Sequence, residues 1–503
     1  MNIFGKQNVV GKQNVHIPSV FTQIPNPFTL LRHPKPVITP KINKKHSLQV
    51  FPLQVKQTLL LLALALLQPY VSSNTFAEES LRKRGKPAPH ALMHTHQAAH
   101  TADSLLENRQ GQRAGAIAYP DLNLDTIDVR GNLEGDLHTE TVPNFSKSVG
   151  EQFAAVTPNQ NVVFYSLEPQ LQEFVKRTIR TAAAPHAAIV VMNPHTGAIL
   201  AIAGKSNSIK NIEYHSEFPA ASLFKIVTAA AAIEESGISK DTRVAFRGGT
   251  YTLNKWNYLP NPRKDRRLMP VGEAMGRSCN PVFGHIALKH LDGSILARYA
   301  HRFGFNQEIG LESPLERSHA NIPHSSKYQL SRTAAGFGDV TISPIHAAAL
   351  VSGIANGGLL PRPYFVDRIA TAEGATIVKT EPEFLQRIVQ PQTAESLLEM
   401  MHYTTTVGTS RKAFMRGKKP VLGNIDVAAK TGTLRGNNPK GLNNWFVATA
   451  PIANPKVAIA VITVNAKYSS KASYLGRSVL KKFFEENRPQ YITRASLNTA
   501  KPP

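Results

Sequence analysis

The stretch of sequence that decides the fold and the chemistry is PAASLFKIVTAAAAIEESG, residues 219–237. Its alanine-rich, mostly apolar body followed by a glycine predicts a buried helix that ends at Gly237. Ser222 and Lys225 stand near the start of this helix. Because positions i and i+3 share one face of a helix, we expect the Lys225 amine to reach the Ser222 hydroxyl.

A serine hydroxyl is a weak nucleophile until a base removes its proton. A neutral lysine can be that base where burial and nearby positive charge lower its pKa. The start of a helix also offers backbone N–H groups to a developing oxyanion. The spacing alone is weak evidence, because Ser478 and Lys481 repeat it on a segment that we interpret as a solvated helix face. The Pro219-Ala220-Ala221 entry and the apolar helix distinguish Ser222.

A second short motif is Ser278-Cys279-Asn280. Its serine hydroxyl can relay a proton between the base and a leaving group, and its asparagine amide can hold a substrate carbonyl. We expect Cys279 to pack inward, since a free cysteine usually behaves as a small hydrophobe. This motif is also weak alone, because S-x-N spacing occurs elsewhere in the chain.

A third motif is Lys430-Thr431-Gly432-Thr433, which contains the K-T-G sequence and ends a predicted strand at 425–433. The lysine amine and the threonine hydroxyls can bind a carboxylate. Gly432 permits close approach of a ligand to the backbone.

The three motifs S-x-x-K, S-x-N and K-T-G, in this order, are the set found in penicillin-binding proteins and class A β-lactamases. Residues 161–490 resemble a penicillin-binding transpeptidase domain nearly throughout. The resemblance is carried by stretches such as NPHTGAILAIAG (193–204), VGEAMGRSCNPVFGHIAL (271–288) and GFGDVTISPIHAAALVSGIANGGLLPRPYFV (336–366). There are two departures: Ala221 stands where the family usually has glycine, and Cys279 lies inside the second motif.

The resemblance implies a role for each motif residue, and it implies no cofactor and no metal. The backbone N–H groups of the nucleophile and of the last threonine would form the oxyanion hole. Three residues would be catalytic: Ser222 as the acylated nucleophile, Lys225 as the general base and Ser278 as a proton shuttle. Five residues would bind substrate: Asn280, Lys430, Thr431, Gly432 and Thr433.

The remaining pattern predicts an α/β (α+β) fold of the β-lactamase/transpeptidase type. Strands at both ends of the domain, with helices between about 271 and 410, suggest one antiparallel sheet flanked by helices, plus a helical lobe. The other predicted elements are a strand at 162–167, a helix at 168–182, a β-hairpin at 187–204, strands at 444–451 and 457–465, and a helix at about 473–487.

The composition and net charge indicate which classes of partner the chain is suited to bind. The chain has 503 residues, 42% of them hydrophobic and 18% charged, which suits a globular protein. Its formal net charge is +24, and residues 1–57 hold eight Lys/Arg and no Asp/Glu, which leaves +16 for the remainder. This balance favours anionic partners. Nucleic acid is not expected, because no zinc-finger, helix-turn-helix or RNA-binding signature is present. The single cysteine excludes an intramolecular disulfide framework.

The N-terminal region has the pattern of a segment that directs export. Residues 58–67, TLLLLALALL, have the length of a signal-peptide core, with cleavage expected after Ala77. An uncleaved anchor is the alternative, and either places the domain in the periplasm or on the outer face of the cytoplasmic membrane. His94 and His96 are interpreted as part of a linker rather than as metal ligands. The predicted divisions are 1–77 basic leader and signal peptide or anchor, 78–112 flexible linker, 113–160 small β-rich cap or pedestal, 161–490 transpeptidase domain and 491–503 tail.

We therefore expect a peptidoglycan D,D-transpeptidase that forms an acyl-enzyme at Ser222 with D-Ala-D-Ala stem peptides and is inhibited covalently by penicillins. The roughly 80 residues between cleavage site and domain are too few for a glycosyltransferase domain, so the chain reads as a compact, single-module version. Other cell-wall synthesis proteins are possible partners, and the membrane is met through the leader alone.

Three alternatives stay open. They are a D,D-carboxypeptidase or endopeptidase, a β-lactam or muropeptide sensor or scaffold, and, least favoured, a β-lactamase. The context of Glu312 and Glu316 (GLESPLER, 310–317) matches the transpeptidase pattern better than a water-activating loop. Acceptor identity, oligomeric state and envelope type are not decided by the sequence.

Overall fold

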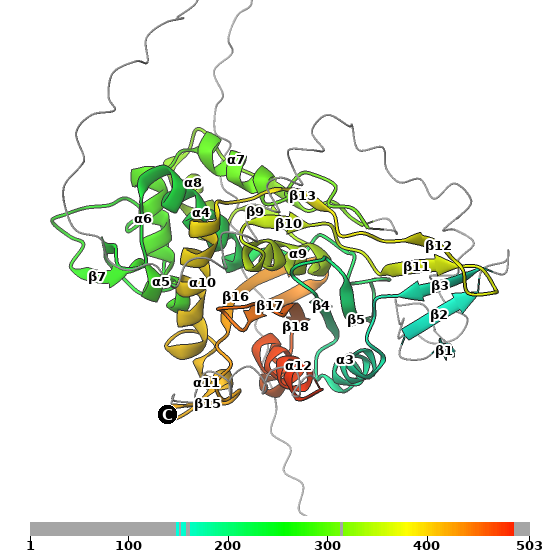
Figure 1. The fold of residues 1–503 in the computed structure, drawn as a ribbon. Helices are drawn as coiled ribbons and strands as arrows, with labels where there is room; N and C mark the ends of the chain where they lie inside the picture. Colours follow the sequence, from blue (N-terminus) through cyan, green and yellow to red (C-terminus); the bar gives the residue numbers. More distant parts are fainter. Residues whose placement is uncertain (1–146, 150–151, 157–160, 312–314, 487–503) are drawn as a thin grey trace, which may run out of the picture. The chain divides into compact units, whose positions relative to one another are not determined.

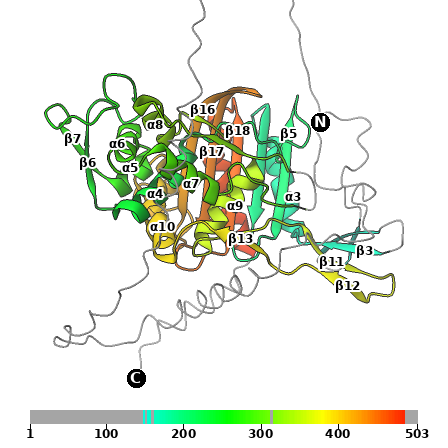
Figure 2. The ribbon, with the colours of Figure 1, turned by 90° about the horizontal axis from the view of Figure 1, so that it is seen from above.

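The computed structural model describes residues 147–149, 152–156, 161–311 and 315–486. Its centre is a five-stranded antiparallel sheet in the order β16-β17-β18-β4-β5, seen edge to edge in Figure 2. Strand β18, from the end of the domain, pairs with β4, from its start. The predicted sheet built from both ends of the domain is therefore confirmed. Its strands are β4 (His186–Met192), β5 (Ile199–Ser206), β16 (Ala428–Asn437), β17 (Lys440–Ala450) and β18 (Val457–Val464).

The central sheet separates two hydrophobic cores, because successive side chains of a strand point to opposite faces. Ile189 and Val191 face a core formed with α3 and α12, whereas Val190 faces a core formed with α9 and the helical lobe. Every residue of α9 is buried, as expected for a helix that is apolar all round. Figure 1 shows α3 and α12 on one side of the sheet and α9 on the other. These helices are α3 (Pro169–Thr181), α9 (Pro344–Ala355) and α12 (Ala472–Glu486).

The helical lobe lies beside the β16 edge of the sheet (Figure 1). Its central helix α4 ends at Gly237, which adopts a left-handed conformation with φ 62°, as the sequence predicted. A short 3-10 turn, η1, precedes α4 and carries the serine of the first motif. The elements of the lobe and its attachments are η1 (Ala221–Leu223), α4 (Phe224–Ser236), α5 (Val271–Arg277), α6 (Asn280–His290), α7 (Gly293–Arg302), α8 (Lys327–Ala334), α10 (Pro391–Thr406) and α11 (Arg411–Phe414).

The strand that carries K-T-G is longer than predicted. It runs through Asn437 and forms a hairpin with β17, which begins at Lys440. The predicted end at residue 433 is wrong. Beyond it Leu434 and Gly436 alternate with the exposed Arg435 and Asn437, a segment too short and too polar to be recognised as an edge strand from a hydrophobic pattern.

A second sheet, in the order β1-β2-β3-β11-β12, lies at the far end of the described chain from the lobe (Figure 1). Strand β2 pairs with β3 across residue 160, where we predicted the boundary between the β-rich cap and the transpeptidase domain. That boundary stays a prediction. The pairing of β3 with β11, from the middle of the chain, was not predicted. The strands are β1 (Lys147–Val149), β2 (Gln152–Val156), β3 (Val162–Tyr165), β11 (Val366–Ala370) and β12 (Thr376–Lys379).

Short strand pairs and one turn complete the described chain. They are β6 (Arg243–Phe246) with β7 (Arg267–Pro270), β8 (His319–Asn321) with β9 (Asp339–Thr341), β10 (Leu359–Pro361) with β13 (Phe384–Arg387), β14 (Met415–Arg416) with β15 (Lys419–Pro420), and the 3-10 turn η2 (Tyr468–Ser470).

The leader, the linker with its histidines and the tail lie outside the described residues. Within the described ranges, none of the helices has the length and apolar character needed to cross a membrane.

Candidate active site

The first motif lies where an extended segment turns into η1 and α4. The extended segment is fixed on two sides: Trp445 Nε1 donates to Pro219 O at 2.9 Å, and Ala220 N donates to Val340 O at 2.9 Å. Ser222 is partly exposed between the buried Ala221 and its buried neighbour on the other side. The serine is therefore presented from a rigid turn on the border between sheet and helical lobe.

Lys225 points from the first turn of α4 toward this serine. Its Nζ lies 2.8 Å from Ser222 Oγ, which confirms the contact predicted from the i, i+3 spacing. The same amine contacts Asn280 Oδ1 at 2.7 Å and Ala335 O at 2.6 Å. Three acceptors from three different elements therefore hold the amine beside the hydroxyl.

Burial makes Lys225 suited to act as a base. Its side chain is completely buried, and desolvation lowers its pKa to about 7. We had expected nearby positive charge to contribute as well. Positive charge instead lowers the pKa of Lys430. This pKa lies well below its usual value, first because of burial and then because of the Lys225 ammonium. A substantial fraction of Lys225 is consequently neutral near pH 7.

The second and third motifs meet each other directly. Lys430 Nζ lies 3.0 Å from Ser278 Oγ and donates to Thr431 O at 2.7 Å. Ser278 adopts a left-handed conformation, with φ 56°, at the end of α5, which turns its hydroxyl toward β16. The amide of Asn280 contacts Lys225 through Oδ1 and Tyr251 O through Nδ2. The structure thus joins Ser222, Lys225 and Asn280 in one chain of contacts and Ser278 with Lys430 in another.

Strand β16 forms the edge of the central sheet on the side of the serine. A Cβ atom on Gly432 would lie 3.2 Å from Ala221 Cβ and 3.3 Å from Ala220 O, so glycine lets the strand approach the nucleophile turn. Thr433, the next residue, is exposed. Thr431 instead places its hydroxyl 2.5 Å from Thr409 Oγ1.

Two positions that shape this site received no role from the sequence. Gly336 packs against the nucleophile turn with φ +89°, and a Cβ there would lie 2.2 Å from Ala221 O and 2.9 Å from Ser222 N. Ala335 supplies the carbonyl that holds Lys225. The glycine lies in a stretch that carried the family resemblance, but its contact joins residues more than a hundred positions apart, which no local pattern reveals.

The two departures from the family pattern both have a structural outcome. Ala221 adopts a left-handed conformation with φ 50°, a region that favours glycine. Cys279 is fully buried, and desolvation raises the pKa of its thiol to about 11. The inward packing expected of Cys279 is confirmed, and its thiol is neutral at physiological pH.

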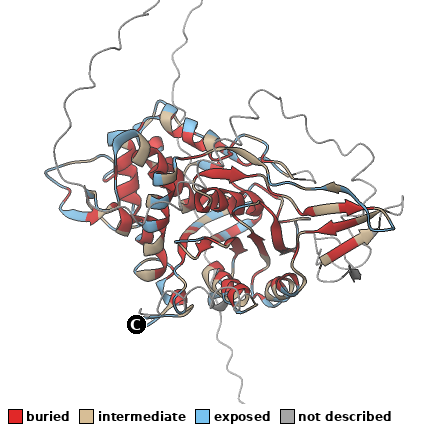
Figure 3. Cartoon of the chain, in the orientation of Figure 1, coloured by how far each residue is buried: buried red, intermediate tan, exposed pale blue. Residues whose placement is uncertain are grey.

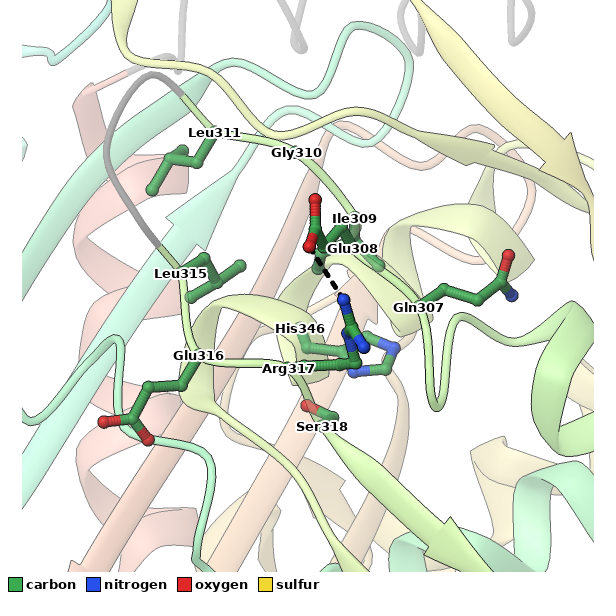
Figure 4. Close-up of a pocket in the computed structure, with 10 residues that line it drawn as sticks. All are labelled: Gln307, Glu308, Ile309, Gly310, Leu311, Leu315, Glu316, Arg317, Ser318 and His346. Carbon is green, nitrogen blue, oxygen red and sulfur yellow. Dashed lines mark hydrogen bonds and ion pairs between the residues drawn. The ribbon is translucent and has the colours of Figure 1, made fainter.

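A separate cavity of about 410 Å³ lies between residues 307–311 and 315–318, with His346 in its wall (Figure 4). Glu308 and Arg317 form an ion pair at 2.7 Å beside it. None of the motif residues lines this cavity.

The two glutamates considered for a water-activating role have separate outcomes. Glu316 accepts from Ser216 N at 2.8 Å and lies 3.1 Å from His215 Nδ1. These are its contacts in the described structure, so it is engaged away from the serine. Glu312 lies outside the described residues.

The family model of the penicillin-binding protein transpeptidase domain matches residues 187–485, well over half of the chain. The chain belongs to the penicillin-binding protein transpeptidase family. The match spans all three motifs and the central sheet from β4 to β18, together with nearly all of α12.

Two curated relatives illustrate the similarity. The peptidoglycan D,D-transpeptidase PbpA of Mycobacterium tuberculosis is 26% identical over 380 residues, covering 67% of this chain and 75% of the relative. Stage V sporulation protein D of Bacillus subtilis is 26% identical over 326 residues, covering 60% of this chain and 49% of the relative.

Solved penicillin-binding protein structures share the fold. The D,D-transpeptidase domain of a peptidoglycan glycosyltransferase from Eggerthella lenta matches with a TM-score of 0.54 and 25% identity, covering 65% of this chain and 83% of that domain. Penicillin-binding protein A from Mycobacterium tuberculosis matches with a TM-score of 0.53 and 26% identity, covering 63% and 81%. The same protein as an imipenem acyl-enzyme complex matches with a TM-score of 0.52 and 25% identity.

Proposed function

We propose that this penicillin-binding protein is a peptidoglycan D,D-transpeptidase that is acylated at Ser222 by D-Ala-D-Ala stem peptides. The observation that carries the proposal is the contact of 2.8 Å between Ser222 Oγ and the buried Lys225 amine. A lysine whose pKa is about 7 can accept the serine proton at physiological pH.

In the first step, Ser222 Oγ attacks the carbonyl of the penultimate D-alanine while Lys225 Nζ takes the hydroxyl proton. The backbone N–H groups of Ser222 and Thr433 are proposed to hold the oxyanion. Two glycines support this assignment: Gly336 lets its loop pack directly on the Ala221–Ser222 peptide, and Gly432 lets β16 approach Ala220 and Ala221.

The C–N bond to the terminal D-alanine then breaks, and its amine needs a proton. We propose that the Lys225 ammonium supplies this proton by way of the Ser278 hydroxyl, which Lys430 Nζ holds at 3.0 Å, and so returns to its neutral form. In the second step, the amine of another stem peptide attacks the ester and gives up a proton to Lys225. Lys225 passes this proton to Ser222 Oγ as the ester C–O bond breaks, which restores the free enzyme. Asn280, whose amide is already bound at both ends, is proposed to fix Lys225 and the adjoining wall of the site.

Lys430 and Thr433 are the proposed partners of the terminal carboxylate, with Thr431 held behind them by Thr409. Burial disfavours a charged Lys430 in the free site. An arriving carboxylate favours the charged form of a nearby amine and would restore the ammonium. Substrate binding would therefore convert the Lys430 amine to its charged form.

The similar proteins are consistent with this reaction. The Mycobacterium tuberculosis relative is named a peptidoglycan D,D-transpeptidase, and its solved form with imipenem is an acyl-enzyme. We therefore propose β-lactams as covalent inhibitors, export from the cytoplasm as the delivery route, and the cell wall as the place of action. Contact with the membrane through the leader and with other cell-wall synthesis proteins remains part of this proposal.

The experiment that tests the proposal is incubation of the purified protein with a D-Ala-D-Ala muropeptide, followed by mass spectrometry of the products. We expect cross-linked dimers together with released D-alanine. The Ser222→Ala variant sets the background.

Other products would contradict cross-linking in different ways. Trimmed monomers without dimers indicate a carboxypeptidase, and cleavage of added dimers indicates an endopeptidase. A fluorescent penicillin label at Ser222 that persists while no muropeptide product forms indicates a sensor. Rapid loss of the label indicates a β-lactamase, and failure to label indicates a scaffold.

A further inference from the structure

The longest irregular segment of the helical lobe connects two short paired strands. Strands β6 and β7 are joined in register at Phe246 and Arg267, and residues 247–266 between them contain neither helix nor strand. Connections longer than about 12–15 residues without secondary structure are uncommon in compact domains and usually serve a function. We call residues 247–268 the arm; β7 marks its position at the outer side of the lobe (Figures 1 and 2).

A buried polar frame holds the arm in place. Arg247 donates to Asp265 Oδ1 at 2.6 Å and to Leu259 O at 3.2 Å. The fully buried Asn257 donates to the backbone carbonyls of Arg247 and Thr252. Its own carbonyl contacts His285 of α6 at 3.0 Å. A segment held by so many internal hydrogen bonds presents its outer side chains from fixed positions.

The outer side chains of the arm are aromatic, aliphatic and cationic, and Figure 3 shows exposed residues along the outer side of the lobe where the arm lies. Four of the eight large hydrophobic side chains that are exposed in the described chain belong to it: Tyr251 (66% exposed), Trp256 (54%), Leu259 and Leu268. The Arg247 guanidinium lies 5.7 Å from the centre of the Trp256 ring, which keeps that ring in one orientation.

The arm is also strongly basic. It contains six Lys/Arg and one Asp, and Asp265 is buried against Arg247. None of the ion pairs found in the described ranges involves the four other exposed cations outside β7: Lys255, Arg263, Lys264 and Arg266.

The arm adjoins the active site. Asn280 N donates to Thr250 O at 2.8 Å, and Asn280 Nδ2 donates to Tyr251 O at 2.8 Å. The same asparagine contacts Lys225. A polymer bound along the arm would therefore pass close to the catalytic groups at Tyr251, because Asn280 contacts both Tyr251 and Lys225.

We propose that the arm binds the glycan strand of uncross-linked peptidoglycan together with the anionic stem peptides that it carries. The apolar C–H face of a sugar ring can pack on exposed Tyr and Trp rings. The exposed cations of the arm attract the carboxylates of the stem peptides that are attached along such a strand. This inference rests on the proposed function for the identity of the polymer, whereas the aromatic and cationic surface is independent of it.

The test compares binding of soluble, uncross-linked peptidoglycan strands that retain their stem peptides to the full protein and to two variants. Trp256→Ala removes the central ring, and R263E/K264E/R266E reverses three exposed charges. We expect each variant to bind the strands about tenfold more weakly, since a Trp ring that becomes covered by the ligand and clustered charges contribute most to such surfaces. Binding by the unaltered protein should weaken as salt rises.

A matched control reverses three exposed cations on another hairpin, R416E/K418E/K419E. Unchanged binding in both arm variants, or an equal loss in this control, would overturn the proposal. Competition by polyglutamate as effective as that of the glycan at equal charge would also overturn it and indicate an acidic polypeptide partner. Labelling by fluorescent penicillin is measured on every variant. If the unaltered protein binds glycan but neither labels nor cross-links, the proposed function fails while the arm inference stands.

Discussion

Two segments of the described chain carry a serine and a lysine three residues apart, and their surroundings differ. Lys225 is completely buried and contacts Ser222 at 2.8 Å, whereas the Lys481 side chain is 58% exposed and pairs with Glu485 at 3.4 Å. Ser478 Oγ donates to Tyr474 O one turn back on its own helix. Spacing brings a lysine to the same face as a serine, but burial and converging acceptors from other elements make it a base.

The largest effect is expected when the nucleophile is replaced, with Ser478 as the matched serine for comparison. Ser222→Ala should abolish covalent labelling by a fluorescent penicillin, because it removes the hydroxyl that lies 2.8 Å from the buried Lys225 amine. Ser478→Ala should label as the unaltered protein does. Mass spectrometry of the labelled peptide checks the position, and persistent labelling of Ser222→Ala would refute the assignment.

The second-largest effect on acylation is expected when the base, Lys225, is replaced. Lys225→Arg keeps the positive charge but cannot lose its proton, so acylation should slow by about 10²–10⁴-fold. Lys481→Arg should leave the rate unchanged, because Lys481 is paired in solvent. Acylation rate constants from stopped-flow fluorescence measure both. Equal rates for Lys225→Arg and the unaltered protein would mean that another group removes the serine proton.

The nucleophile turn is held from outside, which the helix around Ser478 does not need. Gly336→Ala places a methyl group 2.2 Å from Ala221 O, so the turn must shift, and a displacement of about 1 Å can cost roughly 10²-fold in rate. Gly374→Ala is the matched control, since Gly374 has φ +91° with nothing within 4 Å of the added atom.

Acylation rates and thermal unfolding midpoints of both glycine variants separate the two effects. We expect both variants to lose stability from backbone strain, and Gly336→Ala alone to lose acylation. A rate loss in Gly374→Ala of the same size would assign the effect to strain rather than to the contact.

The lowered pKa of Lys225 predicts a pH dependence that an exposed lysine would not give. With a pKa of about 7, the neutral fraction of Lys225 falls about tenfold for each pH unit below that value. The acylation rate constant should therefore rise with pH, tenfold per unit, and level off above about 7. A rate that is flat between pH 5 and 9 would contradict a lysine base.

The sequence predicted the parts of this comparison that depend on local pattern. Periodicity and spacing predicted three features: the helix that ends at Gly237, the Ser222–Lys225 contact, and the antiparallel sheet built from strands at both ends of the domain. Contacts between distant segments could not be predicted, because no periodicity connects them. Gly336 against Ala221 and Thr409 against Thr431 are of this kind.

The same limit applies to the contacts of the second motif. The role of Ser278 as a proton relay between Lys225 and the leaving group stays a prediction, and the contact of its hydroxyl with Lys430 was not predicted. The left-handed conformation of Ser278 sets this direction, and a residue other than glycine rarely signals such a conformation in a sequence.

The smallest expected effect concerns Ala221, the residue before the nucleophile. Ala221→Gly removes a methyl group but also relieves a φ of 50°, which costs a residue with a side chain about 1–2 kcal/mol. Ala231→Gly, in the buried middle of α4, removes the same group from an ordinary helical conformation and should destabilise by about 2 kcal/mol through lost burial and helix propensity. Chemical denaturation should therefore show Ala221→Gly within about 1 kcal/mol of the unaltered protein, with the acylation rate changed by no more than a few fold. If both variants lose equal stability, the left-handed turn before Ser222 is not what separates it from Ser478, and the difference must lie in Lys225 alone.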